Sequence, residues 1–434
     1  MKNTTARALV DFIEAGPSCY HVIDTLRKEL TEQGYELLRE EAAWELRPGG
    51  KYAVIRGDAA LIAFRVPEGT PAGFLMAAAH CDTPTFKLRE TAEVESAGSL
   101  VLSVEPYGGV VYRTWMDRPL SVAGRVMVEE DGGIRSRLVN IDRDLFVIPG
   151  VAPHLDHSIN DGSVLKANVD MRPLLGTPAD KGKLRALVAE TAGVQPEQII
   201  GTELFLYPRV PGTVVGFDEE YVAVPRLDDL QCVFACKEGF LQAETGGSIP
   251  VLCVLNNEEV GSGSPQGADS DLLQDTLARI SAALGRTPAQ HCQALAESFM
   301  VSADNAHAIH PNHPEYADTN EKVRINGGVV IKYSARLRYS TDGISAAVFR
   351  RVCRMAEAPV QIYSNRADLP GGSTLGHISA VHVSVPTVDV GLAQHSMHSA
   401  CELAGVADTE HLIRTMTVYF SRTLRRTEDG GITL

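Results

Sequence analysis

The stretch that most constrains the fold is Gly247–Ser264, in which an apolar run is followed by two acids and a glycine-rich turn. Ile249–Leu255 is short and rich in Val and Leu, which is typical of a buried strand in a parallel sheet. Glu258 and Glu259 follow it, at the end of the strand where open α/β sheets bind ligands. Because adjacent side chains diverge, one carboxylate can bind a cation while the other faces a water on it. We therefore predict Glu259 as a metal ligand and Glu258 as a general base; the alternative is two surface acids on a solvated loop.

Composition excludes several classes of protein. The 434 residues are 44% hydrophobic and 22% charged, which is ordinary for one large or two medium globular domains. The net charge of −15 argues against nucleic acid or an anionic membrane as a partner, and bound divalent metal could match part of the acidic excess. No apolar run approaches the length of a membrane span. The eight cysteines are scattered without a CxxC motif, so we expect reduced thiols in a cytoplasmic protein.

The order of predicted elements indicates an α/β protein with a β-rich insertion. Residues 1–90 and 225–434 mix helical and strand patterns, whereas residues 91–224 contain short β-like runs broken by Gly, Asp and Pro. In the last part we expect helices at Leu227–Gln242, Ala289–Met300 and Asp408–Leu424, and strands at Val329–Tyr333, Val360–Ser364 and His382–Val390.

Five stretches carry His, Asp or Glu at predicted strand ends or loop starts: His80-Cys81-Asp82, Asp228-Asp229, Glu258-Glu259, Asp304 with His307 and His310, and His395 with His398. Imidazole and carboxylate together suit zinc, manganese or cobalt, and two such ions about 4 Å apart can share a bridging carboxylate. Each stretch alone has a plainer explanation, such as a turn, a helix N-terminus or a solvated loop. No spacing matches a zinc finger or an HExxH helix, so only the combined pattern favours a metal site.

The chain resembles the aspartyl aminopeptidase family of dinuclear metallopeptidases over nearly its whole length. Eight segments carry the resemblance in order: AAAHCDTPTFKLR, VEPYGGVVYRTWMDRPLSVAGRV, FVIPGVAPHLDHSIN, VPRLDDLQC, NNEEVGSGSPQGADS, VSADNAHAIHPNHPEY, LPGGSTLG and VGLAQHSMHS. The resemblance implies a metallopeptidase α/β catalytic domain with a central mixed sheet, interrupted by a β-rich domain that serves assembly. It also implies a homo-oligomer, a dodecamer built from dimers, that acts on peptides.

The resemblance implies five metal ligands, namely His80, Asp228, Glu259, Asp304 and His395. Asp228 would bridge two divalent ions per subunit, expected to be zinc with manganese or cobalt as alternatives, while the pairing of the other ligands stays open. Glu258 would be the general base. Asp82 would lie behind His80 and fix the orientation of its ring.

Further residues are implied on the substrate side. His154, in the inserted domain, would enter the active site of a neighbouring subunit and stabilise the oxyanion. Lys332, Tyr339 and His307 would line the pocket for the first side chain of the peptide, where a cation suits Asp or Glu. The alternatives are a strand lysine, a packing tyrosine and a surface histidine.

Four residues depart from the pattern of the family. It usually has Asn at Asp229 and often has Cys at Gly371. We also align Gln394 with a usual Met before the ligand histidine, and His398 with a usual Arg after it. None of these departures removes a predicted ligand, but together they bear on how the substrate is held.

The implied activity is that of a metal-dependent aminopeptidase, which releases N-terminal Asp or Glu through attack by a metal-bridging hydroxide. Alternatives are an aminopeptidase of broader or neutral specificity, another dinuclear exopeptidase or deacylase, and a metal-free assembly protein. A dehydrogenase is disfavoured because no GxGxxG motif follows a predicted strand.

Overall fold

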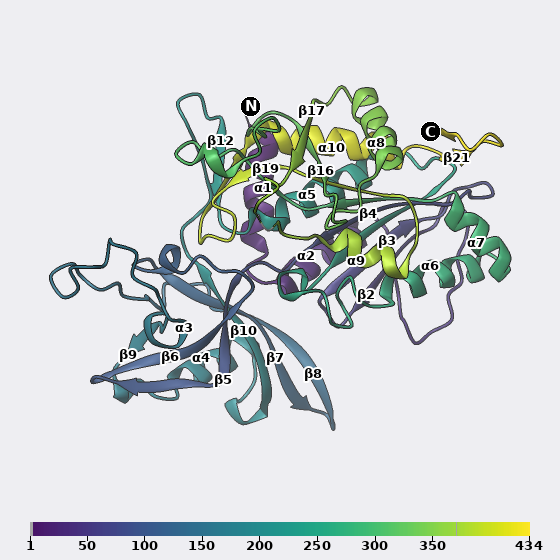
Figure 1. Ribbon diagram of the computed structural model, residues 1–434. Helices are drawn as coiled ribbons and strands as arrows, with labels where there is room; N and C mark the ends of the chain where they lie inside the picture. The colour runs from purple at the N-terminus through teal and green to yellow at the C-terminus, as the bar shows by residue number, and fades with distance from the viewer. Residues whose placement is uncertain (1–2, 370) are drawn as a thin grey trace.

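The computed structural model describes residues 3–369 and 371–434, which form two lobes (Figure 1). The larger lobe is built on a nine-stranded mixed sheet in the order β1-β2-β3-β13-β4-β14-β18-β16-β17. Its strands are β1 (Glu36–Leu38), β2 (Lys51–Arg56), β3 (Ala60–Arg65), β4 (Phe74–His80), β13 (Ile249–Leu255), β14 (Phe299–Ala303), β16 (Val329–Tyr333), β17 (Val360–Ser364) and β18 (Thr387–Gly391). This arrangement confirms the predicted α/β fold with a central mixed sheet.

Four neighbouring strands in the middle of this sheet run parallel. β4 pairs in parallel with β13 on one side and with β14 on the other, and β14 pairs in parallel with β18. β3 and β16 flank this group and are antiparallel to it. The carboxyl ends of the four parallel strands therefore meet along one edge of the sheet, where α/β folds bind ligands.

Helices cover both faces of the sheet because alternate residues of each strand point to opposite sides. On β4, for example, Leu75 and Ala77 belong to one core, and Phe74 and Met76 to the other. The first core includes α1 (Thr4–Ala15), α2 (Cys19–Glu32), α5 (Leu227–Gln242), α8 (Gly343–Met355) and α10 (Val406–Phe420). The second includes α6 (Leu272–Ala283), α7 (Pro288–Ala296) and α9 (Leu375–His382).

Two predicted elements differ from the structure in type over part of their length, and the helix predicted over 408–424 spans Val406–Phe420. The helix predicted over 289–300 ends at Ala296, and the apolar residues after it form strand β14. The strand predicted over 382–390 is shorter, because helix α9 ends at His382 and β18 begins only at Thr387. Apolar runs of this length fit a buried strand and a buried helix segment equally well, so periodicity does not separate them.

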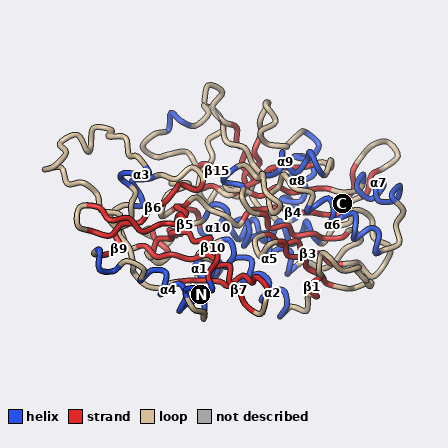
Figure 2. Tube along the Cα trace, turned by 90° about the horizontal axis from the view of Figure 1, so that it is seen from below, coloured by secondary structure: helices blue, strands red, loops and turns tan. Residues whose placement is uncertain are grey.

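The smaller lobe, at the lower left of Figure 1, is a six-stranded antiparallel sheet in the order β8-β7-β10-β5-β6-β9. Its elements are β5 (Thr85–Ser96), β6 (Ser99–Tyr107), β7 (Leu120–Glu130), β8 (Gly133–Asn140), α3 (Ala167–Asp170), β9 (Leu174–Gly176), α4 (Lys183–Ala192) and β10 (Ile199–Pro208). A separate apolar core lies between this sheet and α4. In Figure 2, β5, β6 and β9 lie on one side of the molecule and β1, β3 and β4 on the other.

A third sheet joins distant parts of the chain in the order β11-β12-β20-β19-β15. Its strands are β11 (Thr213–Val215), β12 (Tyr221–Val224), β15 (Ala306–His307), β19 (Ala393–His395) and β20 (Glu402–Gly405), and the short strands β21 (Arg425–Arg426) and β22 (Ile432–Thr433) form a fourth. β11 and β12 fall inside the predicted insertion, yet β12 pairs with β20 near the C-terminus. Among the described helices, none combines the length and apolarity needed to cross a membrane.

Candidate metal centre

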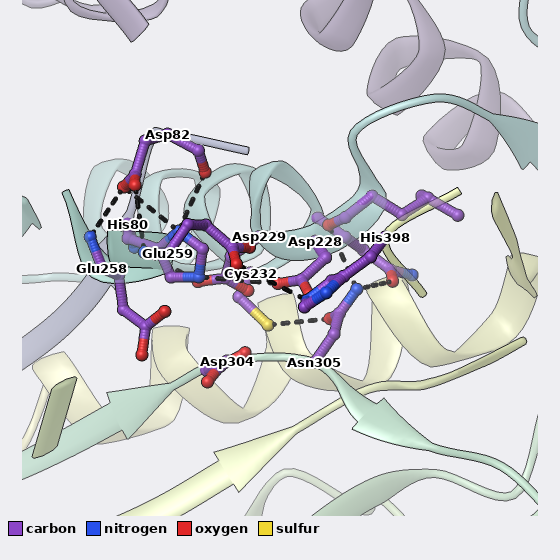
Figure 3. Close-up of polar contacts among 12 residues, drawn as sticks. His80, Asp82, Asp228, Asp229, Cys232, Glu258, Glu259, Asp304, Asn305 and His398 are labelled. Atoms are coloured by element: carbon purple, nitrogen blue, oxygen red, sulfur yellow. Dashed lines mark hydrogen bonds and ion pairs between the residues drawn. The ribbon is translucent and has the colours of Figure 1, made fainter. Parts of the chain in front are cut away.

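The parallel strands bring acids and imidazoles from distant parts of the chain to one place (Figure 3). His80 is the last residue of β4, Glu258 and Glu259 follow β13, and Asp304 follows β14. Because these strands are parallel neighbours, their carboxyl ends lie side by side. Asp228 joins them from the start of α5, where the backbone at Asp228 is not helical.

The side chains form overlapping groups whose ligand atoms lie within 4.8 Å of one another. One group is His80, Asp228 and Asp304; the second is Asp228, Glu259 and His398; the third is His80, Glu258 and Glu259. Asp228 belongs to the first two groups, and its two carboxylate oxygens face different imidazoles. Its Oδ1 lies 3.5 Å from Nε2 of His80, and its Oδ2 lies 3.2 Å from Nε2 of His398.

This donor set fits a pair of divalent cations. The four carboxylates of Asp228, Glu258, Glu259 and Asp304 gather in a largely buried space, and Oδ1 of Asp228 has no hydrogen-bond partner. Buried carboxylates are costly unless cations meet them, and nitrogen and oxygen donors together suit zinc. The residues present could therefore hold two ions that share Asp228.

His398, and not His395, is the histidine that the structure brings to this centre. Among the described residues, His395 belongs to none of the ligand groups; its ring lies 5.8 Å from the ring of His310. Ser396 and His398 both have left-handed backbone, with φ of 58° and 66°, so the chain turns sharply between the two histidines. The structure thus places His398 where His395 was predicted as a ligand.

Backbone contacts hold His398 in place. Its N–H donates to Oε1 of Glu402 over 2.7 Å, and its ring Nδ1 lies 3.1 Å from the carbonyl oxygen of Gly109. If Nδ1–H donates to that carbonyl, the lone pair of Nε2 faces Asp228 and Glu259. Glu402 also accepts the N–H of Asp228 over 3.0 Å, so one buried carboxylate supports two residues of the centre. The sequence analysis missed Glu402, whose only local signal is its position four residues after His398.

Asp82 contacts His80 and also supports the acidic turn, which is the turn that carries Glu258 and Glu259. Nδ1 of His80 lies 2.9 Å from the carbonyl oxygen of Asp82 and 3.5 Å from its Oδ1. The two carboxylate oxygens of Asp82 accept the backbone N–H groups of Glu258 and Glu259, each over 3.1 Å. Asp82 therefore orients the ring of His80 chiefly through its backbone, while its side chain fixes the turn that carries Glu258.

Burial and mutual repulsion shift the protonation of these groups. Burial raises the pKa of the Glu258 carboxyl to about 8; His80 opposes the shift, and the charges of Asp304 and Asp82 add to it. Burial and the charge of Asp228 likewise raise the pKa of Glu259. For Asp228, burial is outweighed by contacts with His398 and His80, which lower the pKa of its carboxyl. Burial also raises the pKa of Asp304, so that, of the four carboxyls in the centre, only Asp228 has a lowered pKa.

Asp229 is one of the departures from the family pattern. It is fully buried, its Oδ2 accepts the N–H of His80 over 3.2 Å, and burial raises the pKa of its carboxyl well above the usual range. Asp229 therefore supports the backbone of His80 from beneath the centre. Gln394 has a similar supporting position, because its Oε1 accepts a hydrogen bond from Asn305 over 2.6 Å.

The predicted substrate-side residues lie beside the centre. Nζ of Lys332 is 3.6 Å from Oδ2 of Asp304, donates to the carbonyl oxygen of Asn305 over 3.0 Å, and lies 5.4 Å from the ring centroid of Tyr339. Lys332 is only 2% exposed. His307 lines a cavity of ≈ 310 Å³ together with Tyr363 and other residues. The rings of His307 and Tyr339 each lie 6.3 Å from the ring of Tyr363, which therefore connects the two.

His154 is placed apart from the centre within one subunit. It lies in the loop between β8 and α3 of the smaller lobe and is exposed.

Residues 12–420 match the family described as "Aminopeptidase I zinc metalloprotease (M18)". The chain belongs to the M18 family. It is 40% identical to "Probable M18 family aminopeptidase 2" of Clostridium acetobutylicum over 97% of this chain and 100% of the relative. It is 37% identical to the protein of the same name from Pseudomonas aeruginosa over 97% of this chain and 99% of that one.

Solved structures agree with this assignment to M18. A chain in the "Cryo-EM structure of the Ape4 and Nbr1 complex" matches 96% of this chain and 85% of its own length, with 34% identity and a TM-score of 0.92. The "Structure of S. cerevesiae mApe1 dodecamer" matches 97% of both chains, with 27% identity and a TM-score of 0.85. The protein is therefore a metal-dependent aminopeptidase, a hydrolase that acts on peptide bonds.

Proposed function

We propose that each chain binds two divalent ions, zinc in the first instance and manganese or cobalt as alternatives. His80 and Asp304 would hold one ion, Glu259 and His398 the other, and Asp228 would bridge them. The observation that carries this proposal is the sharing of Asp228 by two compact ligand groups. When bound, such a pair polarises the scissile carbonyl and lowers the pKa of a water molecule.

Glu258 is the proposed general base and acid. Its carboxylate would take a proton from the attacking water and return it to the leaving amine of the peptide. Burial raises the pKa of the Glu258 carboxyl in the metal-free centre, and bound cations would lower it again, so that the carboxylate could accept a proton near neutral pH. The hydrogen bond from the backbone N–H of Glu258 to Asp82 supports its position.

For the first side chain of the peptide we propose a preference for Asp or Glu. Lys332 offers a buried ammonium beside the centre, and a carboxylate of the substrate could pair with it. Tyr339 and His307 would form the rest of the pocket wall through their contacts with Tyr363.

A broader specificity is the second candidate, and one observation favours it. Nζ of Lys332 already has two oxygen partners, Asp304 at 3.6 Å and the carbonyl of Asn305 at 3.0 Å. If these contacts satisfy the ammonium, the pocket gains little from a second carboxylate and would accept neutral side chains.

We also propose that residues 91–224 act as an assembly unit inserted between catalytic parts at 1–90 and 225–434. The mApe1 relative is a dodecamer, and this chain would assemble in the same way from dimers. The loop that carries His154 exposes Val151, Leu155 and Val164, and such apolar side chains suit a subunit contact. His154 would then reach the active site of a neighbouring subunit. The eight cysteines are all free, which fits a reducing, cytoplasmic setting.

The test is to strip the protein of metal, restore zinc, manganese or cobalt separately, and measure release of the first residue from peptides that begin with Asp, Glu, Ala or Leu. We expect release only after reloading, and faster release of Asp and Glu than of Ala and Leu. Faster release of Leu or Ala would replace acidic by broad specificity. No release with any metal, from protein that binds metal, would contradict the proposed site.

A further inference from the structure

Three consecutive residues of the smaller lobe lie against the metal centre of the larger one. Tyr107 is the last residue of β6 and pairs with Thr85 of β5 in the smaller lobe, and Gly108 and Gly109 follow it. None of these three residues belongs to a candidate ligand group among the described residues. Their contacts nevertheless reach both the acidic turn after β13 and the histidine after β19.

Tyr107 connects the two supports of the acidic turn. Its hydroxyl donates to Oδ2 of Asp82 over 2.9 Å and accepts a hydrogen bond from Nδ2 of Asn257 over 2.8 Å. Asp82 is the residue whose carboxylate accepts the N–H groups of Glu258 and Glu259. Asn257, which directly precedes Glu258, has left-handed backbone with φ of 60°. The hydroxyl of Tyr107 therefore links the carboxylate of Asp82 to Asn257, the residue at which the acidic turn begins.

The two glycines continue this contact. A Cβ on Gly108 would lie 3.0 Å from Cβ of Glu259, so the absence of a side chain lets the segment approach that residue closely. The carbonyl oxygen of Gly109 lies 3.1 Å from Nδ1 of His398. Glu259 and His398 are the two residues that we assign, with Asp228, to one ion.

We propose that Tyr107–Gly109 is a positioning element by which the smaller lobe holds Glu259 and His398 in the geometry that retains this ion. The inference rests on the proposed metal site and goes beyond it, because it makes metal retention depend on a segment of the other lobe. Side chains that support metal ligands typically change metal affinity or activity by about 10- to 100-fold when they are removed.

The first experiment compares Tyr107→Phe with Tyr207→Phe. Tyr107→Phe removes two hydrogen bonds, to Asp82 and from Asn257. Tyr207 lies in the same lobe, and its hydroxyl donates to Oδ1 of Asn140 over 2.8 Å, a contact that does not reach the centre. Each variant is stripped of metal and titrated with zinc in competition with a chromophoric chelator. We expect Tyr107→Phe to weaken zinc binding by about 10-fold or more, and Tyr207→Phe to leave it within about twofold of the wild type.

The second experiment compares Gly108→Ala with Gly98→Ala. Both glycines belong to the smaller lobe and have similar positive φ, +76° and +78°, so the backbone strain of the substitution is matched. A Cβ at Gly98 would meet no atom within 4 Å, whereas one at Gly108 would press on Glu259. We expect only Gly108→Ala to weaken zinc binding, and we expect excess zinc to restore kcat of Tyr107→Phe with KM unchanged.

If Tyr107→Phe and Gly108→Ala bound zinc as tightly as the wild type, this inference would be overturned. The proposed metal site would remain intact. If each variant and its control lost zinc affinity equally, the inference would also be overturned, because equal losses would indicate general destabilisation of the protein. If the wild-type protein bound no divalent ion, the proposed site and this inference would fail together.

Discussion

Asp228 is the residue on which both proposed ion sites depend. Its carboxylate is almost completely buried, and its oxygens lie 3.5 Å and 3.2 Å from imidazole nitrogens of His80 and His398. Two positively charged imidazoles could satisfy these oxygens, but so could two cations that the imidazoles help to bind. The high density of carboxylates around Asp228 favours the second explanation, because each additional buried anion needs a positive partner.

The assignment of His398 as a ligand predicts that two histidines three residues apart behave differently. His398→Ala should lose one of the two ions and most of the activity, because it removes a nitrogen donor from the group that includes Glu259. His395→Ala should keep both ions, since its ring contacts His310 instead. Metal content of the purified variants by elemental analysis checks this. Loss of an ion in His395→Ala alone would reverse the assignment.

Part of the centre could be predicted from the sequence because strand ends are visible in it. His80, Glu258, Glu259 and Asp304 each stand where an apolar run stops, and parallel pairing brings such positions together. The choice between His395 and His398 depended on a sharp turn whose left-handed residues carry no distinctive sequence signal. Support from Tyr107 could not be predicted either, because that contact forms only after two lobes pack together.

At the scale of elements, strand β18 fixes two loops through hydrogen bonds to one buried side chain, that of Asp389. Oδ1 of Asp389 accepts the hydroxyl of Thr374 over 2.6 Å, and Oδ2 accepts the N–H of Ser340. Ser340 follows Tyr339, and Thr374 precedes α9. Asp389 is fully buried, so these two hydrogen bonds have no competition from water. The strand thereby fixes the segment that presents Tyr339 to the proposed pocket.

Substitutions at Asp389 should separate loss of these hydrogen bonds from loss of charge. Asp389→Ala leaves buried donors without a partner and should lower the free energy of unfolding by about 2 kcal/mol or more. It should also raise KM for peptides that begin with Asp, because the segment beside Tyr339 is released. Asp389→Asn can still accept the N–H of Ser340 and donate to the hydroxyl of Thr374, so its effects should be smaller. Denaturant unfolding and steady-state kinetics test both; equal behaviour of the two variants would contradict this role.

Element boundaries were predictable where the apolar pattern ended at residues that interrupt helices or strands. β13, β16 and α5 begin and end at the predicted residues. The strand β14 was missed because its first two residues, Phe299 and Met300, were assigned to the end of the predicted helix 289–300. The pairing of β12 with β20, which lies much later in the chain, could not be predicted because it has no local signal.

At the scale of the whole molecule, His154 requires a partner if it has a role in catalysis. It is exposed in the loop between β8 and α3 of the smaller lobe, and the ligand groups lie at strand ends of the larger one. Within one chain, His154 belongs to none of the ligand groups found among the described residues. In an oligomer, the same loop can supply an oxyanion-stabilising donor to a neighbouring centre.

Mixing two inactive variants tests this arrangement. His154→Phe and Glu258→Gln should each bind metal normally and have strongly reduced kcat. In a mixed pair, the subunit with intact Glu258 receives an intact His154 from its neighbour, so one centre recovers. Random pairing should restore about a quarter of the wild-type activity per subunit, because half of the pairs are mixed and each has one complete centre. No recovery in co-assembled protein would exclude a role for His154 across the interface.

The place where the chain crosses between lobes has a practical consequence for protein engineering. β5 begins at Thr85, just beyond Asp82, and β6 ends at Tyr107, whose hydroxyl returns to Asp82. A chimera that takes its smaller lobe from a relative would thus also import part of the surroundings of the metal. Such a graft should retain metal only if the residues at 82, 107 and 257 come from the same parent.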